Sequence, residues 1–461
     1  MLKIHVVRQG GHHYYVDDLV PGRAEGTLVA GESPGAWTGT GARALGVADA
    51  VEATSFGEVL EGRHPREGTS LRAIRGDRSV AGFDLTFCAP KSVSILHLLA
   101  PGEIAGQVGD GHHAAVAEAT DYLQRAAVRV RRTRDGHLAL MPSTGMVAGN
   151  FVHRTSRALD PHLHSHLVVA NVAEGVDGVW STVDSRRIFA HLGAAGAVYH
   201  ARLRWELSER IGAAWEVPAT GLGDVVGVEA RMRRLFSQRS AAVDEYVMRR
   251  AAVPTGGPTR TQVAFHATRP EKDRSHTVES LAIQWRQRAA DFGYDLGELT
   301  RAVGRRREVA TVPEIDRGRV HERLQHLASH QRSLSHRDVV GVLAGASTGG
   351  TRAQVVESVA ARILEGSGEA LDPSGSGTPG VEQRRGTGAS EPRRSAADLV
   401  RFVEGQPEEL ASIAELPGWR TAVEGPGVGR RRSLGRDGVV ARSLAGERAD
   451  ERMLGDAQLG R

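Results

Sequence analysis

The stretch Phe151–Asn171 reads FVHRTSRALDPHLHSHLVVAN and combines strand-forming residues with closely spaced histidines. Gly149–His153 and His164–Asn171 are rich in the β-branched and aromatic residues that favour strands. Asp160-Pro161 between them is typical of a turn. We therefore expect two neighbouring antiparallel strands, because a short turn returns the second strand beside the first.

The histidines of this stretch predict a metal site. Alternate side chains of a strand share one face, so His164 and His166 project the same way and can reach one ion. The turn folds His153 back beside them, and three neutral imidazoles with open water positions make a Lewis-acid centre. The side chain of His162 projects to the same face as that of His164. It is a substitute for His153 as the third ligand, although it directly follows the turn. Each histidine taken alone is more often an ordinary surface or core residue than a ligand.

Segments of helical and strand character surround this stretch in an irregular order. Apolar residues at helical spacing predict helices over Ala115–Arg131 and His191–Ile211. Gly82–Phe87 and Leu138–Pro142 have strand character. This order favours an α+β fold, an antiparallel sheet with packed helices, over a regular βαβ series.

The composition of the chain changes towards its end. Ser335–Glu365 predicts two short amphipathic helices broken at Ser347–Gly350, and the sequence beyond is rich in Gly, Ser, Pro and Arg. We read that tail as mostly disordered, with a short apolar stretch at Ala397–Phe402 as a transient helix. The expected organisation is a folded domain at 1–310, a small helical accessory unit at 311–366 and a Gly/Arg-rich tail at 367–461.

Charge and cysteine content restrict the class of protein. The 461 residues include 59 basic and 55 acidic side chains, a net charge of +4 that permits a polyanionic partner. The single cysteine, Cys88, excludes a disulfide framework and a cysteine-based zinc site. No apolar run approaches the roughly 20 residues needed to span a bilayer, and the first residues lack a signal peptide. We expect a soluble cytoplasmic protein without membrane insertion.

A pair of adjacent phenols, Tyr14 and Tyr15, lies early in a chain that holds six tyrosines. Paired aromatics at a strand edge are a common packing device. The alternative is a nucleophile, which needs a nearby base or cation because the ordinary phenol pKa is about 10. The predicted metal site would supply that cation.

The segment Gly82–Leu96, GFDLTFCAPKSVSIL, is the third candidate for chemistry. Asp84 interrupts an apolar strand, which is costly unless the carboxylate is paired with a ligand or catalytic histidine or lies at a strand edge facing water. The following APKSVS predicts the start of a helix, with Ser92 or Ser94 as its cap and Lys91 beside N–H groups that can hold a phosphate.

Together these motifs resemble the TrwC/TraI-type conjugative relaxases, the MobF group of HUH endonucleases. The Tyr-Tyr doublet, GFDLTFCAPKSVS and HRTSRALDPHLHSHLVVAN followed by Trp180-Ser181-Thr182 occur in the order and spacing of that family. The resemblance covers roughly residues 1 to 310 and more faintly the helical unit after it. It implies a palm-like antiparallel sheet with packed helices. It also implies an enzyme that nicks and religates one DNA strand at an origin of transfer.

The resemblance also assigns roles to residues of this chain. His153, His164 and His166 match the metal ligands, with Mg²⁺ or Mn²⁺ expected and Zn²⁺ as an alternative. Asp84 matches an acidic residue that acts as a base or orients a ligand histidine. Tyr14 and Tyr15 match the first tyrosine pair, whose leading member forms a 5′-phosphotyrosine linkage and frees a 3′-hydroxyl. The expected partner is single-stranded DNA, with a coupling protein or an accessory DNA-binding protein as a further candidate.

Two departures from the family pattern bear on activity. Ala24–Leu28 has no phenol where family members commonly carry a second tyrosine pair, and no GxxxxGKS or GxxxxGKT phosphate loop of a helicase occurs. The chain is therefore expected to nick without unwinding, or to be an inactive DNA-binding remnant of a relaxase. For DNA contacts beyond the scissile phosphate we select Lys91, Arg154 and Arg157, because positive charge beside the metal motif attracts the backbone.

Two other enzyme classes use similar chemistry. A rolling-circle replication initiator shares the tyrosine and the histidine-bound metal, but the spacing between His153 and His164 favours the conjugative type. A cupin-like oxygenase also places an HxH pair on a strand. That class requires a glutamate four or five residues after the second histidine, where this chain has Ala170 and Asn171.

Overall fold

Five antiparallel strands form the central sheet, in the order β1–β3–β7–β6–β2. They are β1 Lys3–Arg8, β2 Ala36–Thr38, β3 Val80–Cys88, β6 Ala148–Thr155 and β7 Pro161–Ala170. The computed structural model describes residues 2–9, 34–249 without 75, 77, 135–136 and 219–220, and also 263–264, 267–268, 276–303, 315–365 and 393–405. The expected α+β class with an antiparallel sheet is confirmed.

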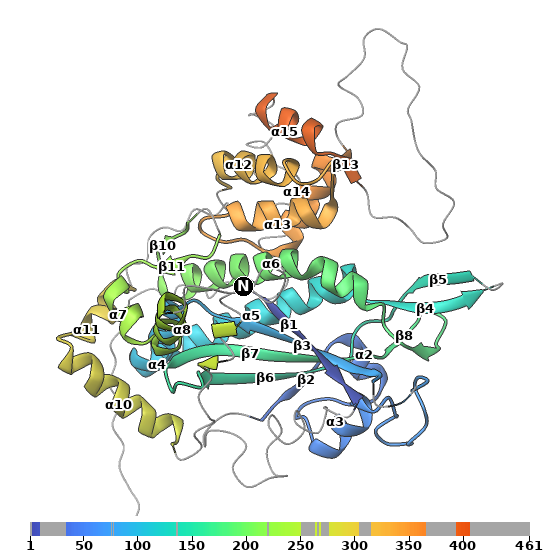
Figure 1. Cartoon of the computed structure of the whole chain (residues 1–461), viewed down its shortest axis with the longest axis horizontal. Helices are drawn as coiled ribbons and strands as arrows, with labels where there is room; N and C mark the ends of the chain where they lie inside the picture. The colour runs from blue at the N-terminus through green and yellow to red at the C-terminus, as the bar shows by residue number, and fades with distance from the viewer. Residues whose placement is uncertain are drawn as a thin grey trace, which may run out of the picture. The chain divides into compact units, whose positions relative to one another are not determined.

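Smaller sheets and the helices complete the described part of the chain (Figure 1). Two-stranded sheets pair β4 Arg129–Arg134 with β5 His137–Pro142, β8 Ala173–Glu174 with β9 Trp180–Ser181, β10 Trp215–Glu216 with β11 Asp224–Val225, and β12 Ser333–Ser335 with β13 Arg393–Ser395. The helices are α2 Thr40–Ala44, α3 Ala53–Leu60, α4 Lys91–Leu99, α5 Gly102–Ala126, α6 Ser185–Ile211, α7 Ala230–Leu235, α8 Gln238–Arg249, α10 Val278–Asp291, α11 Gly297–Ala302, α12 Arg317–Ala328, α13 His336–Ala346, α14 Ala353–Glu365 and α15 Ala396–Gly405.

The two faces of the central sheet are covered differently. Leu167 and Val169 of β7 belong to a large core that also contains the buried residues of α5 and α6. Val168 points the other way and belongs to a second core with Phe56 of α3. Because side chains alternate along a strand, the face that carries Val168 also carries the even-numbered histidines of β7.

Both long helices begin earlier than the sequence predicts. Helix α6 begins at Ser185 rather than at His191 and ends at Ile211 as expected. The apolar pattern predicts a helix over Ala115–Arg131, but α5 begins at Gly102 and ends at Ala126. Glycines in its first half obscure the apolar pattern that marks a helix. One of them, Gly111, lets α6 approach closely, because a Cβ there would lie 2.8 Å from Leu207 Cδ2. Its end is set by Val130, which pairs with Met141 in the β4–β5 hairpin.

A group of smaller helices, α12 to α15, packs beyond α6. Their expected break is confirmed, since α13 ends at Ala346 and α14 begins at Ala353. The predicted boundary at residue 310 lies outside the described residues. Arg204 of α6 is 1% exposed and donates hydrogen bonds to the backbone carbonyls of Ala344 and Ser347 at the end of α13.

One segment of the predicted disordered tail differs from that prediction. Residues 393–405 form β13 and α15, and Leu399 of α15 is fully buried in the large core. The apolar stretch at Ala397–Phe402 therefore forms a packed helix rather than a transient one, because α12 offers it a partner surface. The remaining residues of the tail lie outside the described part, and their disorder stays a prediction.

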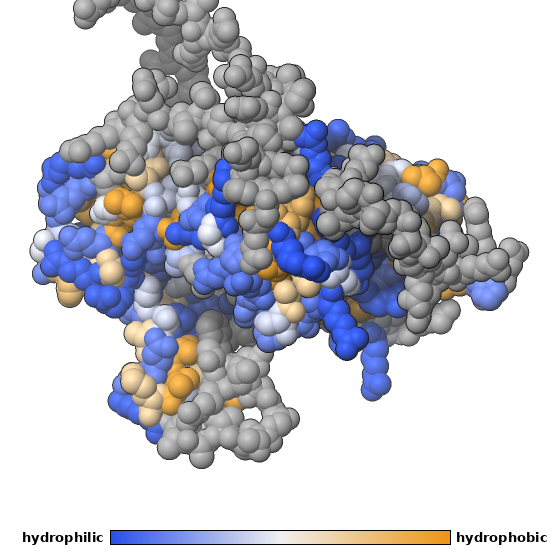
Figure 2. Space-filling model, turned by 90° about the horizontal axis from the view of Figure 1, so that it is seen from above, coloured by the Kyte–Doolittle hydropathy of each residue, from blue (hydrophilic) through white to orange (hydrophobic). Residues whose placement is uncertain are grey.

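One side of the molecule shows how polar and apolar residues are distributed on its surface. Figure 2 shows hydrophilic residues over most of the coloured surface on the side it presents, with hydrophobic residues in separate spots. Among the helices that the structure describes, none combines the length and the apolar character that crossing a membrane requires.

Candidate metal centre

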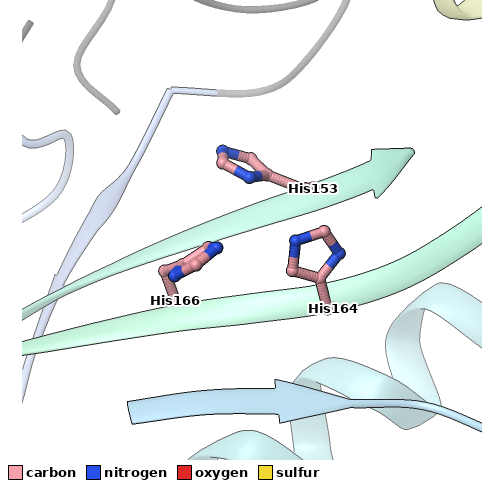
Figure 3. A group of neighbouring side chains, drawn as sticks. All are labelled: His153, His164 and His166. Atoms are coloured by element: carbon pink, nitrogen blue, oxygen red, sulfur yellow. The ribbon is translucent and has the colours of Figure 1, made fainter. Parts of the chain in front are cut away.

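His153, His164 and His166 come together on the sheet face away from α5 and α6. His153 of β6 lies directly opposite His164 of β7, and His166 is two residues further along β7. Figure 3 shows the three rings grouped over these two strands. Their ring centroids are 5.2 to 5.3 Å apart, and one nitrogen of each lies within 4.8 Å of the others. Small side-chain rotations bring such nitrogens onto one ion.

Two of the rings are oriented by hydrogen bonds on the nitrogen that faces away from the group. Nδ1 of His166 lies 2.9 Å from both carboxylate oxygens of Asp84. Nδ1 of His164 donates to the carbonyl oxygen of His162 at 2.9 Å. Since both partners are acceptors, Nδ1 carries the proton in each ring and Nε2 keeps a lone pair for a metal.

Burial keeps His164 neutral, which a metal ligand requires. Desolvation, with a smaller contribution from the neighbouring His166, lowers the pKa of His164 to about 3. Three imidazoles with a carboxylate behind one of them fit a divalent cation. Among the residues that the structure describes, this is the one cluster of histidine, cysteine or carboxylate side chains with metal-ligand spacing.

Asp84 is buried, with 5% of its surface exposed, and so does not face water at a strand edge. It lies on β3 opposite Val168, diagonally across from His166, which is opposite Thr86. Both of its oxygens are engaged by His166. Asp84 therefore contacts the ring that an orienting carboxylate would hold, and its role stays a prediction.

His162 has the parity that the sequence suggests but lies outside the triad. Its ring stacks on His164, with centroids 4.6 Å apart and planes at 27°. Burial lowers its pKa well below the ordinary value. His153 is the third member of the group because the register of β6 and β7 sets it opposite His164.

The start of α4 lacks the serine cap that the sequence analysis expected. Pro90 is the N-cap, and neither Ser92 nor Ser94 caps the helix with its side chain. Ser92 Oγ donates to Asp224 at 2.6 Å, and Ser94 Oγ accepts from the backbone of Leu163. These hydroxyls instead tie α4 to β11 and β7, so the expectation of a serine cap is wrong.

Lys91, Arg154 and Arg157 are all half-buried. Lys91 donates from Nζ to the carbonyl oxygen of Pro161 at 2.6 Å, and burial lowers its pKa to about 8. Arg154 follows His153 on β6 and therefore points to the opposite face of the sheet. There burial lowers the pKa of His97 on α4, and the charge of Arg154 also lowers it. Tyr14 and Tyr15 lie outside the described residues.

A buried polar network that the sequence analysis did not identify lies directly beneath the triad. Ser165, between two histidines of the triad but pointing to the helix side, lies 2.8 Å from Nε2 of His112 on α5. Nδ1 of the same ring lies 2.9 Å from the hydroxyl of Tyr199 on α6. No sequence pattern links these residues, because they are far apart in the chain.

Comparisons with known proteins point to one family. The model of the family described as "TrwC relaxase" matches residues 7–292. Two curated proteins from Escherichia coli, both named "Multifunctional conjugation protein TraI", are 31% and 30% identical over 68% of this chain. The matched region spans 17% of the length of either relative.

Solved structures show the same similarity. A metal-free and a metal-bound structure, both titled conjugative relaxase TrwC in complex with oriT DNA, are 28% identical to this chain, with a TM-score of 0.56. Each match covers 64% of this chain and all of the other. A further TrwC structure, 29% identical at a TM-score of 0.55, is described as complexed with a 27-mer DNA that comprises the recognition hairpin and the cleavage site.

Proposed function

This chain belongs to the TrwC relaxase family, and on that premise we propose that it is a metal-dependent nickase and strand transferase. Its substrate is single-stranded DNA at an origin of transfer, cut and rejoined during conjugation. The observation that carries the proposal is the triad of His153, His164 and His166 with Asp84 behind it. The comparisons favour neither a rolling-circle initiator nor a cupin-like oxygenase.

In this proposal, one set of residues holds the ion and another attacks the phosphodiester bond. Nε2 of His164 and of His166, with a ring nitrogen of His153, would hold Mg²⁺ or Mn²⁺, or alternatively Zn²⁺. A bound divalent ion polarises the scissile phosphate and stabilises negative charge in the transition state. Asp84 fixes the tautomer and the orientation of His166.

Tyr14 is the proposed nucleophile, with Tyr15 beside it as the second phenol. The Tyr14 oxygen forms a bond to phosphorus while the bond from phosphorus to the 3′-oxygen breaks. The phenol proton leaves to a base, and the departing 3′-oxygen takes up a proton to become a hydroxyl. Because the phosphotyrosine ester is a phosphodiester like the bond that was cut, the reverse reaction rejoins the strand.

Chain geometry permits Tyr14 to reach the triad. Arg8, at the end of β1, pairs with Val80, whereas His166 pairs with Thr86, about 20 Å further along β3. His166 also lies two strand spacings of about 5 Å each from β1, which makes the full separation about 22 Å. Tyr14 follows Arg8 by six residues, which allow about 20 Å of extended chain, and the length of the tyrosine side chain covers the remainder. This reach supports the assignment.

DNA contacts beyond the cleavage site are assigned to Lys91, Arg154 and Arg157. Cations near the metal hairpin attract the phosphates on either side of the scissile bond. We also propose that the reaction takes place in the cytoplasm and that a coupling protein or an accessory DNA-binding protein is a further partner.

The test is covalent trapping. The full chain is incubated with Mn²⁺ or Mg²⁺ and single-stranded oligonucleotides that tile the DNA around its own gene. We expect one oligonucleotide to give a covalent adduct, with the DNA attached to the tryptic peptide that contains Tyr14 by mass spectrometry. Binding without any adduct in either ion would identify an inactive DNA-binding remnant instead.

A further inference from the structure

The turn between the two histidine strands, residues 156–160, is held by side chains from outside the sheet. Asp160 is 1% exposed, and its Oδ2 accepts a hydrogen bond from the backbone N–H of Gln238 at 2.7 Å. Its Oδ1 accepts from Nε2 of the same glutamine at 2.8 Å. Next to it, the carbonyl oxygen of Leu159 accepts from Nε1 of Trp285 at 2.8 Å. The turn is therefore bonded to both α8 and α10, which we call the arm helices.

The partners of Asp160 are those that a buried carboxylate requires. Gln238 is the first residue of α8, where backbone N–H groups lack partners within the helix and the helix dipole favours negative charge. Arg288 of α10 adds a cation, with Nη1 3.6 Å from Oδ1 of Asp160. The carboxylate thus caps one arm helix and pairs with a cation on the other.

The backbone of the turn depends on this support. Leu159 has a φ of +54°, in the left-handed region that non-glycine residues rarely adopt. Ser156 accepts at Oγ from the N–H of Asp160 and donates its own N–H to the Asp160 carbonyl. A strained residue persists where its surroundings determine its conformation, and here Trp285 and Asp160 supply those surroundings.

The turn connects directly to the triad. Asp160 is followed by Pro161 and then by His162, whose carbonyl oxygen orients the ring of His164. On the other strand the pairing shifts between His153 and Thr155, just before the turn. A displacement of the turn would therefore move His153 relative to His164.

We propose that Asp160 is a positioning residue through which the arm helices hold the histidine hairpin in its metal-binding geometry. The claim that this geometry binds a metal rests on the proposed function. The claim that Asp160 holds the turn concerns the protein alone, because the same carboxylate holds the turn and the N-terminus of α8. Asp160 touches neither the metal nor DNA in this role.

The test compares Asp160→Ala with the full wild-type chain in two measurements. Amide hydrogen exchange of the metal-free protein is expected to speed up at residues 156–164 and in the first turn of α8. The dissociation constant for Mn²⁺ is expected to rise about tenfold, as for residues that orient a metal ligand. Asp160→Asn keeps one acceptor oxygen for Gln238 and should retain most of both properties.

The control is Asp224→Ala, which removes a neighbouring carboxylate that bonds Ser92 and Arg233 rather than the turn. It should leave exchange at residues 156–164 unchanged. Should Asp160→Ala fail to fold, Gln238→Ala removes the Nε2 bond from an exposed side chain and should give the same exchange pattern in weaker form.

The proposal is wrong if folded Asp160→Ala, or failing that Gln238→Ala, keeps the wild-type exchange of the turn. It is equally wrong if Asp160→Ala only lowers the melting temperature while Mn²⁺ affinity stays within twofold. If the wild-type chain itself binds no Mn²⁺, the metal part of the proposed function fails, and hydrogen exchange alone still decides whether Asp160 joins the arm helices to the hairpin.

Discussion

Both carboxylate oxygens of Asp84 lie 2.9 Å from Nδ1 of His166, across neighbouring strands. The two residues are 82 positions apart in the chain. This pairing leaves Nε2 of His166 available to a metal and places a carboxylate behind the triad. The carboxylate should therefore raise the affinity of the site for a cation.

Asp84→Ala is expected to weaken Mn²⁺ binding by about ten- to hundredfold, because His166 loses the partner that fixes its tautomer. Isothermal titration with Mn²⁺ measures the change. Asp121→Ala is the matched control, since Asp121 is an exposed carboxylate on α5 that bonds Gln124. Equal affinities in the two variants would contradict the orienting role of Asp84.

The triad and the stacked ring of His162 can be separated by substitution. His164→Ala should abolish Mn²⁺ binding and DNA cleavage together, because it removes a ligand. His162→Ala should leave most of the affinity, since the His162 carbonyl that orients His164 belongs to the backbone. Mn²⁺ titration and adduct formation measure both effects, and the reverse ranking would move His162 into the ligand set.

Tyr14→Phe should abolish the covalent adduct while leaving oligonucleotide binding nearly unchanged, because only the attacking oxygen is lost. Denaturing gel electrophoresis detects the adduct, and fluorescence anisotropy measures the binding. Tyr15→Phe is the matched control and should still form the adduct. An undiminished adduct in Tyr14→Phe would remove that residue from the mechanism.

The contribution of Lys91 to the free energy of unfolding should depend on pH, since burial lowers its pKa to about 8 from an ordinary value of 10.5. Between these two values the unfolded chain keeps the proton and the folded chain has lost it. The free energy of unfolding of the wild type, relative to that of Lys91→Met, should therefore rise as the pH increases from 8 to 10.5. This gain should be lost when the pH falls back through 8. Urea denaturation at a series of pH values measures the difference, and a constant difference would show that Lys91 titrates normally.

Arg204 links α6 to the end of α13 through the carbonyls of Ala344 and Ser347 and also bonds the carbonyl of Gly221. Arg204→Met leaves these buried acceptors without a donor and should cost about 3 kcal/mol of unfolding free energy. Arg210→Met, which removes a partly exposed ion pair with Glu206, should cost about 1 kcal/mol or less. Urea denaturation tests the ranking, and equal costs would mean that the helices beyond α6 do not depend on Arg204.

Three of the five strands of the central sheet, and one strand of a smaller sheet, could be predicted from local sequence. Strands form at all four expected places, Gly82–Phe87, Leu138–Pro142, Gly149–His153 and His164–Asn171. In the three that belong to the central sheet, β-branched and aromatic residues fit a half-buried pleated surface. The bounds of α5 were less predictable. Its glycine-rich first half lacks helical propensity and is stabilised by close packing against α6.

The amino-acid sequence alone determined the face on which His164 and His166 lie, since the two-residue period of a strand is a local property. The order of its motifs also identified the family. Tertiary structure decided the rest of the site: that His153 rather than His162 joins the group, that Asp84 meets His166, and that Asp160 bonds the arm helices. The physical reason is that these partners depend on the register between strands and on helix packing, which join residues distant in the chain.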